Sequence, residues 1–115
     1  EQRLPVRGLR RAISQQMVAS HLQSVRTLHV DEADMTELVK LRERFKPFAE
    51  KQNVKLSYLP FIMKAVVAAL KAFPMVNASL DEASNEIVRK QYYNLGMAVA
   101  MEAGLVVPVL HNVDK

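Results

Sequence analysis

The stretch LPFIMKAVVAALKAFP, residues 59–74, decides the fold of this chain. Its apolar side chains recur at helical spacing and form a wide face, which predicts a core helix. Pro60 lies in the first turn, where a missing N–H costs nothing. Pro74 ends the helix, because the residue before a proline avoids the helical region.

Two more helices are predicted on the N-terminal side of this stretch. Residues 9–23 carry apolar side chains at near-helical spacing, so we expect an amphipathic helix. Asp34 and Glu37 stand three residues apart in a capping box, which predicts that the next helix starts there. Pro47 should end this second helix near Lys46, or kink it and let it continue for a few residues.

Strands are predicted between and after the helices. Residues 27–34 contain a run of β-forming side chains, which indicates a strand. Residues 76–80 and 86–90, separated by the polar residues 81–85, are typical of a hairpin. The pattern predicts an α/β domain, more closely described as α+β.

Nearly continuous apolar runs mark the last two strand candidates, at residues 92–101 and 105–110. Such runs are typical of strands that are covered on both faces. The second run contains Pro108, which an edge strand tolerates. Either this segment is an edge, or the element that should cover it is missing.

The composition limits the chain to one modest domain or a piece of a larger one. With 115 residues, 50% of them hydrophobic, and no cysteine, it should bury a core without disulfides or a thiolate zinc site. The longest mostly apolar stretch, residues 56–70, contains Lys64 and is too short to cross a bilayer. We therefore expect a soluble domain that does not enter a membrane.

The net charge of +4 comes from residues 1–26, where five arginines stand against a single acid, Glu1. A nucleic-acid binder usually carries aromatic or recognition-helix residues on its basic stripe. This segment has no aromatic residue. Nucleic-acid binding is therefore the weakest of the functions considered.

The chain contains three histidines: His21, His29 and His111. His29 near Asp31, with Ser57 or Ser79, could form a nucleophile–base set, but packing or exposure is the commoner role of such residues. His111 precedes polar residues that favour a turn after a strand. No two histidines have the spacing of a metal site, and the acidic residues before the second helix fit capping better than cation binding.

The chain resembles a known family in five strings that follow one another in that family's order: DEADMTELVKLR (31–42), KLSYLPF (55–61), FPMVNAS (73–79), NLG (94–96) and GLVVPV (104–109). The family is the catalytic core domain of the dihydrolipoamide acyltransferase component of 2-oxo acid dehydrogenase complexes, and the branched-chain type is the most similar. By this resemblance, residues 1–8 are the end of a linker with a lead-in strand. Residues 9–115 are the N-terminal half of the catalytic domain.

The resemblance implies a fold like chloramphenicol acetyltransferase, with helices packed on a mixed β-sheet, present here as an incomplete domain. It also implies a reaction that moves an acyl group between the dihydrolipoyl group of a separate lipoyl domain and coenzyme A, with histidine as general base. The implied partners are further copies in a homotrimer and large core, the 2-oxo acid decarboxylase component and dihydrolipoyl dehydrogenase. The expected compartment is the bacterial cytoplasm, or the mitochondrial matrix in a eukaryote.

Two residues match coenzyme A contacts of the family. Arg42 matches one in the Leu-Arg string, and its guanidinium suits a ligand with several phosphates. The alternative for Arg42 is an exposed arginine that pairs with Glu43 or Glu37. Ser57 matches a second contact, where its hydroxyl could bond the pantetheine arm; it could also cap the helix that begins near Pro60.

Three features depart from the family. Ala100 stands where the family has an aspartate contact, which leaves the details of coenzyme binding open. Val25 and Arg26 replace a Pro-His pair, so His29 is given no family role. The family's catalytic string H-x-x-x-D-G does not occur, so we assign no catalytic residue and expect the general base downstream of Lys115.

The leading hypothesis is therefore an acyltransferase half-domain that supplies coenzyme A contacts and subunit-interface surface, inactive by itself. The alternative is a noncatalytic binding or assembly module on the same scaffold. The acyl group that is carried is left open.

Overall fold

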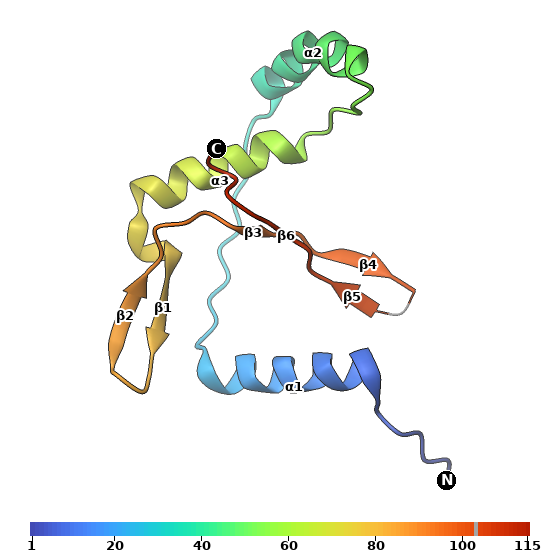
Figure 1. The fold of residues 1–115 in the computed structure, drawn as a ribbon, viewed down its shortest axis with the longest axis vertical. Coiled ribbons are helices and arrows are strands. Elements are labelled where there is room, and N and C mark those ends of the chain that lie inside the picture. Colours follow the sequence, from blue (N-terminus) through green and yellow to red (C-terminus); the bar gives the residue numbers. More distant parts are fainter. Residues whose placement is uncertain (103) are drawn as a thin grey trace. The chain divides into compact units, whose positions relative to one another are not determined.

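The computed structural model describes residues 1–102 and 104–115, and its elements are labelled in Figure 1. The chain divides into two units. One comprises Glu1–Glu32 with Ala98–Pro108, and the other comprises Ala33–Met97 with Val109–Lys115.

The first unit contains one helix and one hairpin. Helix α1 spans Gly8–Gln23, which confirms the helix predicted at residues 9–23, although it buries no side chain. Strand β4 (Val99–Met101) pairs antiparallel with β5 (Gly104–Val106). Gly104 has φ +138, and a Cβ added there would lie 3.0 Å from Cδ2 of Leu9, so α1 and the hairpin approach each other closely at a glycine.

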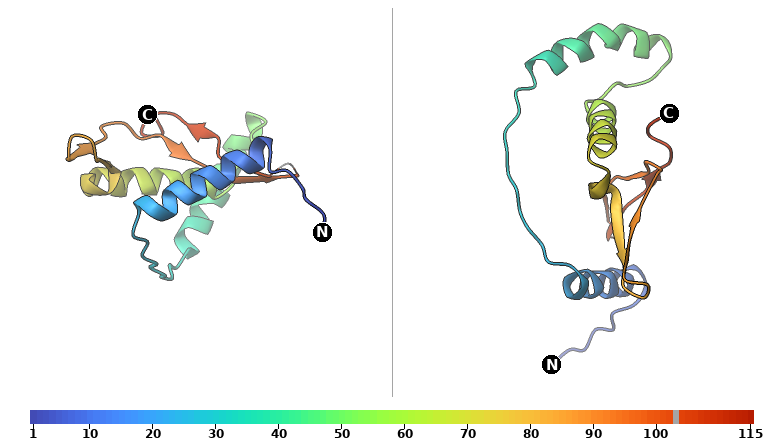
Figure 2. Two further views of the ribbon diagram at one scale, coloured as in Figure 1. Left: turned by 90° about the horizontal axis from the view of Figure 1, so that it is seen from below. Right: turned by 90° about the vertical axis from the view of Figure 1, so that its left-hand side faces the viewer.

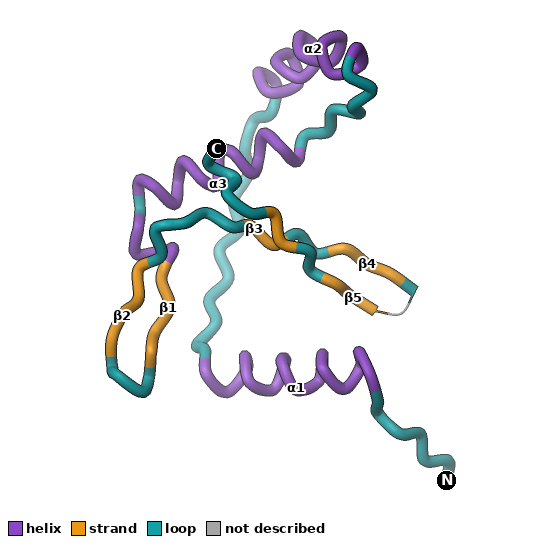
Figure 3. Tube along the Cα trace, viewed as in Figure 1, coloured by secondary structure: helices purple, strands orange, loops and turns teal. Residues whose placement is uncertain are grey.

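The strand predicted at residues 27–34 is wrong. Residues 24–35 form neither helix nor strand, and they belong to the teal loop between α1 and α2 in Figure 3. A strand needs a partner for its backbone groups, and no described strand pairs with this segment. The β-forming side chains there remain exposed.

Helix α2 of the second unit spans Thr36–Lys51. Just before it, Oδ1 of Asp34 accepts hydrogen bonds from the N–H (2.9 Å) and hydroxyl (2.6 Å) of Thr36. The predicted capping box is wrong, because the N-cap residue is Met35, no side chain caps the helix, and Glu37 pairs with Lys40 at 2.7 Å. Of the two alternatives at Pro47, the structure has the helix that continues, which ends four residues later at Lys51.

Helix α3 spans Leu59–Ala72 and confirms the predicted core helix in its position and in both of its ends. Val67 is the only described side chain that is buried, with 4% exposed, whereas Ile62 and Val66 are 44% and 40% exposed. The expectation that the chain buries a core is therefore wrong for the described residues. Burying a wide apolar face requires a second layer, and only short segments of this unit lie against α3.

A short 3₁₀ helix, η1 (Pro74–Asn77), connects α3 to the predicted hairpin, as Figure 2 shows. Strand β1 (Ala78–Asp81) pairs antiparallel with β2 (Glu86–Arg89), so the hairpin is confirmed although its first strand starts two residues late. Asp81 Oδ1 accepts the N–H of Ala83 at 3.0 Å, and Asn85 has φ 54, a combination suited to a tight turn.

The terminal apolar runs form short strands. Strand β3 (Leu95–Gly96) pairs antiparallel with β6 (Val109–Leu110), and Pro108 lies just outside the ladder, where it needs no N–H. The prediction that these runs are covered on both faces is wrong, because Val109 is 50% and Leu110 43% exposed.

The α/β class is confirmed, and all strand pairings of the described residues are antiparallel. No helix in residues 1–102 or 104–115 is both long and apolar enough to span a membrane.

Candidate functional site

The predicted site residues lie in the second unit, where the chain turns from α2 towards α3. Asn53 adopts a left-handed conformation with φ 57 after the last turn of α2. The N–H of Val54 bonds to the carbonyl of Ala49 (2.9 Å) and that of Asn53 to the carbonyl of Glu50 (3.0 Å), which is a Schellman motif. This turn brings the following residues back alongside the helix.

Arg42 is held against that returning segment. Its Nε donates to the backbone carbonyl of Leu56 at 3.0 Å, and its Nη1 lies 2.7 Å from Oε1 of Glu43. The guanidinium carbon lies 4.9 Å from the centre of the Tyr58 ring, in a cation–π contact. With its side chain only 22% exposed, Arg42 is a positioned cation and not a freely moving surface arginine.

The alternative of a helix-surface ion pair is therefore true only in part. Arg42 does pair with Glu43, whereas Glu37 pairs with Lys40. The ion pair uses Nη1 and the Leu56 carbonyl uses Nε. Among the described residues, no hydrogen bond uses Nη2, which leaves that edge of the guanidinium for a ligand.

A cavity of about 430 Å³ opens beside Arg42. It is lined by residues of α2 and the returning segment: Arg42, Lys46, Glu50, Asn53, Val54, Lys55 and Leu56. Three of the lining side chains are cationic and one is anionic, so the cavity favours a negatively charged ligand. We call it the basic cavity.

Ser57 lies between Leu56, whose carbonyl binds Arg42, and Tyr58, whose ring contacts it. Its side chain is exposed and does not line the basic cavity. The capping interpretation of Ser57 is wrong, because Tyr58 occupies the N-cap position of α3 and no side chain caps that helix. The hydroxyl is accessible on the same connector as the Arg42 contacts.

The histidines do not lie in this site. His29 Nε2 is 3.8 Å from Asp31 Oδ2, with 88% and 83% of these side chains exposed, which is a solvated pair. His111 is followed by a turn in which the N–H of Lys115 bonds to the carbonyl of Asn112 at 3.1 Å, as the sequence predicted. No group of three potential metal ligands occurs within the described ranges.

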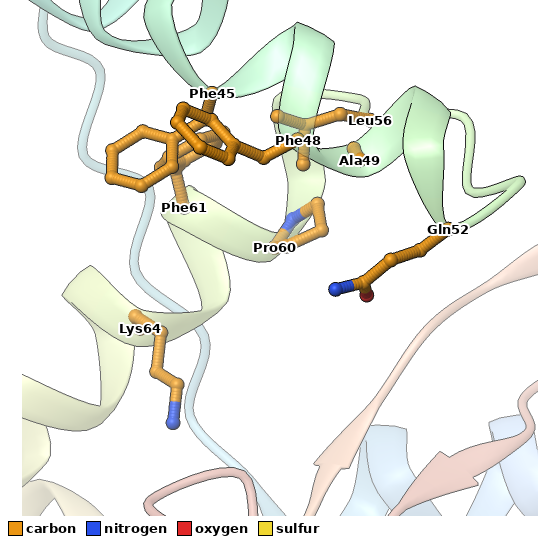
Figure 4. A pocket seen from close by; sticks show the side chains of 8 residues that line it. All are labelled: Phe45, Phe48, Ala49, Gln52, Leu56, Pro60, Phe61 and Lys64. Carbon is orange, nitrogen blue, oxygen red and sulfur yellow. The ribbon is translucent and has the colours of Figure 1, made fainter.

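A second, apolar groove of about 400 Å³ lies between α2 and α3, and Figure 4 shows its lining. Phe45, Phe48 and Phe61 all line it, and the Phe45 and Phe48 ring centres are 6.5 Å apart. This groove was not predicted from the sequence. Lys64 at its edge donates to the carbonyl of Lys115 at 2.8 Å.

Three side chains around Arg42 were also not predicted from the sequence: Lys46, Lys55 and Tyr58. Lys46 follows Arg42 by four residues and so lies on the same helix face, which the sequence could have indicated. Lys55 and Tyr58 flank the Leu-Ser pair, and nothing in their spacing reveals the turn that brings them to the helix. Ala100 lies on β4 of the first unit and offers no polar side chain.

Comparisons with known proteins give a consistent result. Residues 1–115 match the family described as 2-oxoacid dehydrogenases acyltransferase (catalytic domain). The dihydrolipoyllysine-residue acetyltransferase component of the pyruvate dehydrogenase complex of Bacillus subtilis is 43% identical over 115 residues, which is 100% of this chain and 26% of that protein.

Solved structures also resemble the chain. The Azotobacter vinelandii dihydrolipoamide acetyltransferase matches with a TM-score of 0.91 and 36% identity, over 100% of this chain and 47% of that chain. The cubic core of a pyruvate dehydrogenase multienzyme complex matches with a TM-score of 0.91 and 35% identity, over 100% of this chain and 47% of that one.

These matches support the predicted fold class, and the chain spans 47% of the length of these solved chains. The Bacillus subtilis relative and the cubic core are both named for a pyruvate dehydrogenase complex. Their names do not support the narrower prediction of a branched-chain type.

Proposed function

The chain belongs to the 2-oxoacid dehydrogenase acyltransferase (catalytic domain) family, and on this premise we propose that it is part of an acyltransferase core that uses coenzyme A. The proposed reaction moves an acyl group between a dihydrolipoyl-lysine and the thiol of coenzyme A. In this proposal the chain supplies contacts to the coenzyme, with Arg42 on its phosphates and Ser57 on its pantetheine arm.

The observation that carries this proposal is the restrained cation at the basic cavity. Coenzyme A is an anion with several phosphates, and arginine binds phosphate through paired N–H groups in a fixed plane. Arg42 is held from two sides and still has Nη2 available, so it is organised before the ligand arrives. Preorganisation of this kind reduces the ordering cost of binding.

For the acyl group we propose acetyl, since the Bacillus subtilis relative is named an acetyltransferase. A branched-chain acyl group, favoured by the sequence resemblance, is the competing substrate. Rates with acetyl- and isobutyryl-dihydrolipoamide separate the two, and a higher kcat/KM with the isobutyryl substrate would overturn the acetyl proposal.

The general base and the assembly are also proposals. His29 forms a solvated pair with Asp31, and residues 1–115 contain no H-x-x-x-D-G string, so we propose that the base comes from sequence beyond these residues. We further propose that copies of the complete protein form a trimer and that trimers assemble into a larger core; the name of one solved relative supports the core, because it calls that protein the cubic core of a multienzyme complex.

The test of coenzyme binding is Arg42→Ala in the complete enzyme that contains this chain. Loss of a charge-assisted hydrogen bond is worth about 1.5–3 kcal/mol, so the KM for coenzyme A should rise about 10- to 150-fold. Arg44→Ala is the matched control, because Arg44 is on the same helix and does not line the basic cavity. An unchanged KM in Arg42→Ala would remove this residue from the coenzyme site.

The noncatalytic alternative makes a different prediction. The complete protein would then bind its neighbours but fail to exchange an acetyl group between dihydrolipoamide and coenzyme A. A thioester-exchange assay on the complete protein decides this, and the 115-residue chain alone is expected to be inactive in the same assay.

A further inference from the structure

The basic cavity contains two cations that no family contact in the sequence accounts for. Lys46 lies one helical turn after Arg42 on α2, and Lys55 lies on the segment that the Asn53 turn brings back. Residues four apart on a helix share a face, so Lys46 and Arg42 approach the cavity from the same side. Lys55 approaches it from the connector.

Three like charges around one cavity repel each other unless something compensates them. Glu43 pairs with Arg42 and Glu50 lines the cavity, which leaves more cationic than anionic side chains around it. The ion pairs of the described residues involve neither Lys46 nor Lys55. An anion with more than one negative charge would relieve this repulsion.

The size of the cavity limits the ligand. Sites that enclose a drug-sized ligand have volumes of roughly 300–1,000 Å³. At about 430 Å³ the basic cavity is at the lower end of this range and can take a part of coenzyme A, but not the whole molecule. The part with matching charge is a phosphate-bearing end of the coenzyme.

We propose that Lys46 and Lys55 complete, together with Arg42, a phosphate-binding cavity that distinguishes coenzyme A from thiols that lack phosphate. This inference rests on the proposed function and deepens it, because it separates recognition of the phosphates from recognition of the pantetheine arm. Lysine binds phosphate as a point charge, whereas the planar guanidinium fixes orientation. The two lysines therefore increase the affinity for the phosphate, and Arg42 fixes its orientation.

The test compares two acceptors, coenzyme A and pantetheine, in the acyltransferase assay of the complete enzyme. Pantetheine has the same thiol and arm but no phosphate. In Lys46→Gln/Lys55→Gln we expect the KM for coenzyme A to rise about tenfold, and the KM for pantetheine to change by less than about twofold. The same charge change at Lys40→Gln/Lys51→Gln, on α2 but outside the cavity, is the matched control.

A second measurement uses the unmodified enzyme and does not depend on the stability of a variant. Inorganic pyrophosphate should compete with coenzyme A but not with pantetheine. Raising the salt concentration should increase the KM for coenzyme A while leaving that for pantetheine nearly constant, because salt screens charge–charge attraction.

The outcomes separate this inference from the function on which it rests. Equal effects of the cavity pair and the control pair on coenzyme A, or pyrophosphate that inhibits both acceptors equally, would overturn the role of Lys46 and Lys55. If Arg42→Ala still raised the KM for coenzyme A in that case, the proposed function would stand without the lysines. If no variant affected coenzyme A, both would fail.

Discussion

Arg42 and Asn77 are two polar side chains of the second unit that bind backbone carbonyls distant in sequence. Arg42 Nε reaches Leu56, 14 residues away. Asn77 Nδ2 reaches Lys90 at 3.1 Å and Tyr92 at 3.0 Å, 13 and 15 residues away. Each of these two side chains therefore links segments that hydrogen bonds between near neighbours in the sequence cannot link.

The two side chains differ in what they leave free. The Asn77 amide has only two N–H donors, and both are used by carbonyls. The Arg42 guanidinium has five, and its hydrogen bonds to described residues use Nε and Nη1. Asn77 therefore has no donor left for an anionic ligand, whereas Arg42 has spare donors beside a cavity and can bind one.

The largest change in free energy is expected for substitution of Asn77. Asn77→Ala removes two hydrogen bonds between η1 and the segment after β2, and should lower the free energy of unfolding by about 1–3 kcal/mol. Urea denaturation of the complete enzyme at fixed protein concentration measures this. Ser79→Ala, an exposed change on β1, is the control.

Because Asn77 is expected to hold the fold and not to bind coenzyme A, Asn77→Ala should leave the KM for coenzyme A unchanged in the fraction of enzyme that remains folded. A raised KM with unchanged stability would show that Asn77 is part of the binding site, and the distinction drawn between the two side chains would then be wrong.

Tyr58 tests the positioning of Arg42. Tyr58→Leu removes the ring from the guanidinium, and an exposed cation–π contact is worth about 0.5–1 kcal/mol, so the KM for coenzyme A should rise about two- to fivefold. Tyr58→Phe keeps the ring and should behave as the unmodified enzyme. If the two variants had equal KM values, the ring would not be what holds Arg42.

Glu43 tests whether an ion partner competes with the ligand. Glu43→Gln removes a negative charge at 2.7 Å from Arg42 Nη1. A surface ion pair is worth at most about 1 kcal/mol, so we expect the KM for coenzyme A to fall by about fivefold or less. Glu37→Gln, whose carboxylate pairs with Lys40, should have no effect. A rise in KM for Glu43→Gln would mean that Glu43 orients Arg42 instead of competing for it.

The helices and the first hairpin could be predicted because their signals are local. Pro60 and Pro74 delimit α3 within one residue or two, and the polar residues after Asp81 mark the turn between β1 and β2. Each of these signals acts over fewer than about five residues, the range in which backbone preferences and capping operate.

The features that were missed depend on distant neighbours. The run at residues 27–34 has the composition of a strand, but pairing decides whether a strand forms. The contacts of Arg42 with Leu56 and Tyr58 depend on a turn at Asn53, a position at which a glycine would have been a clearer signal. The resemblance to a family pointed to Arg42, but only the fold shows the lysines and the ring around it.

The smallest effect is expected from the hydrogen bonds of Asp34. They are exposed and join residues only two apart in the sequence, whereas those of Asn77 join distant residues. The hydroxyl of Thr36 and, to a lesser extent, its N–H lower the pKa of Asp34 below its ordinary value of 3.8. A carboxyl whose pKa is lower in the folded state stabilises that state above its unfolded pKa, and this contribution disappears as the pH falls through the folded value.

Thr36→Val removes the larger cause of the lowered pKa, so the pKa of Asp34 should rise towards 3.8, whereas Thr36→Ser should keep it low. Carbon-detected NMR titration of the Asp34 carboxyl measures both variants. An equally low pKa in Thr36→Val would assign the lowered pKa to the backbone N–H of residue 36 and not to the threonine hydroxyl.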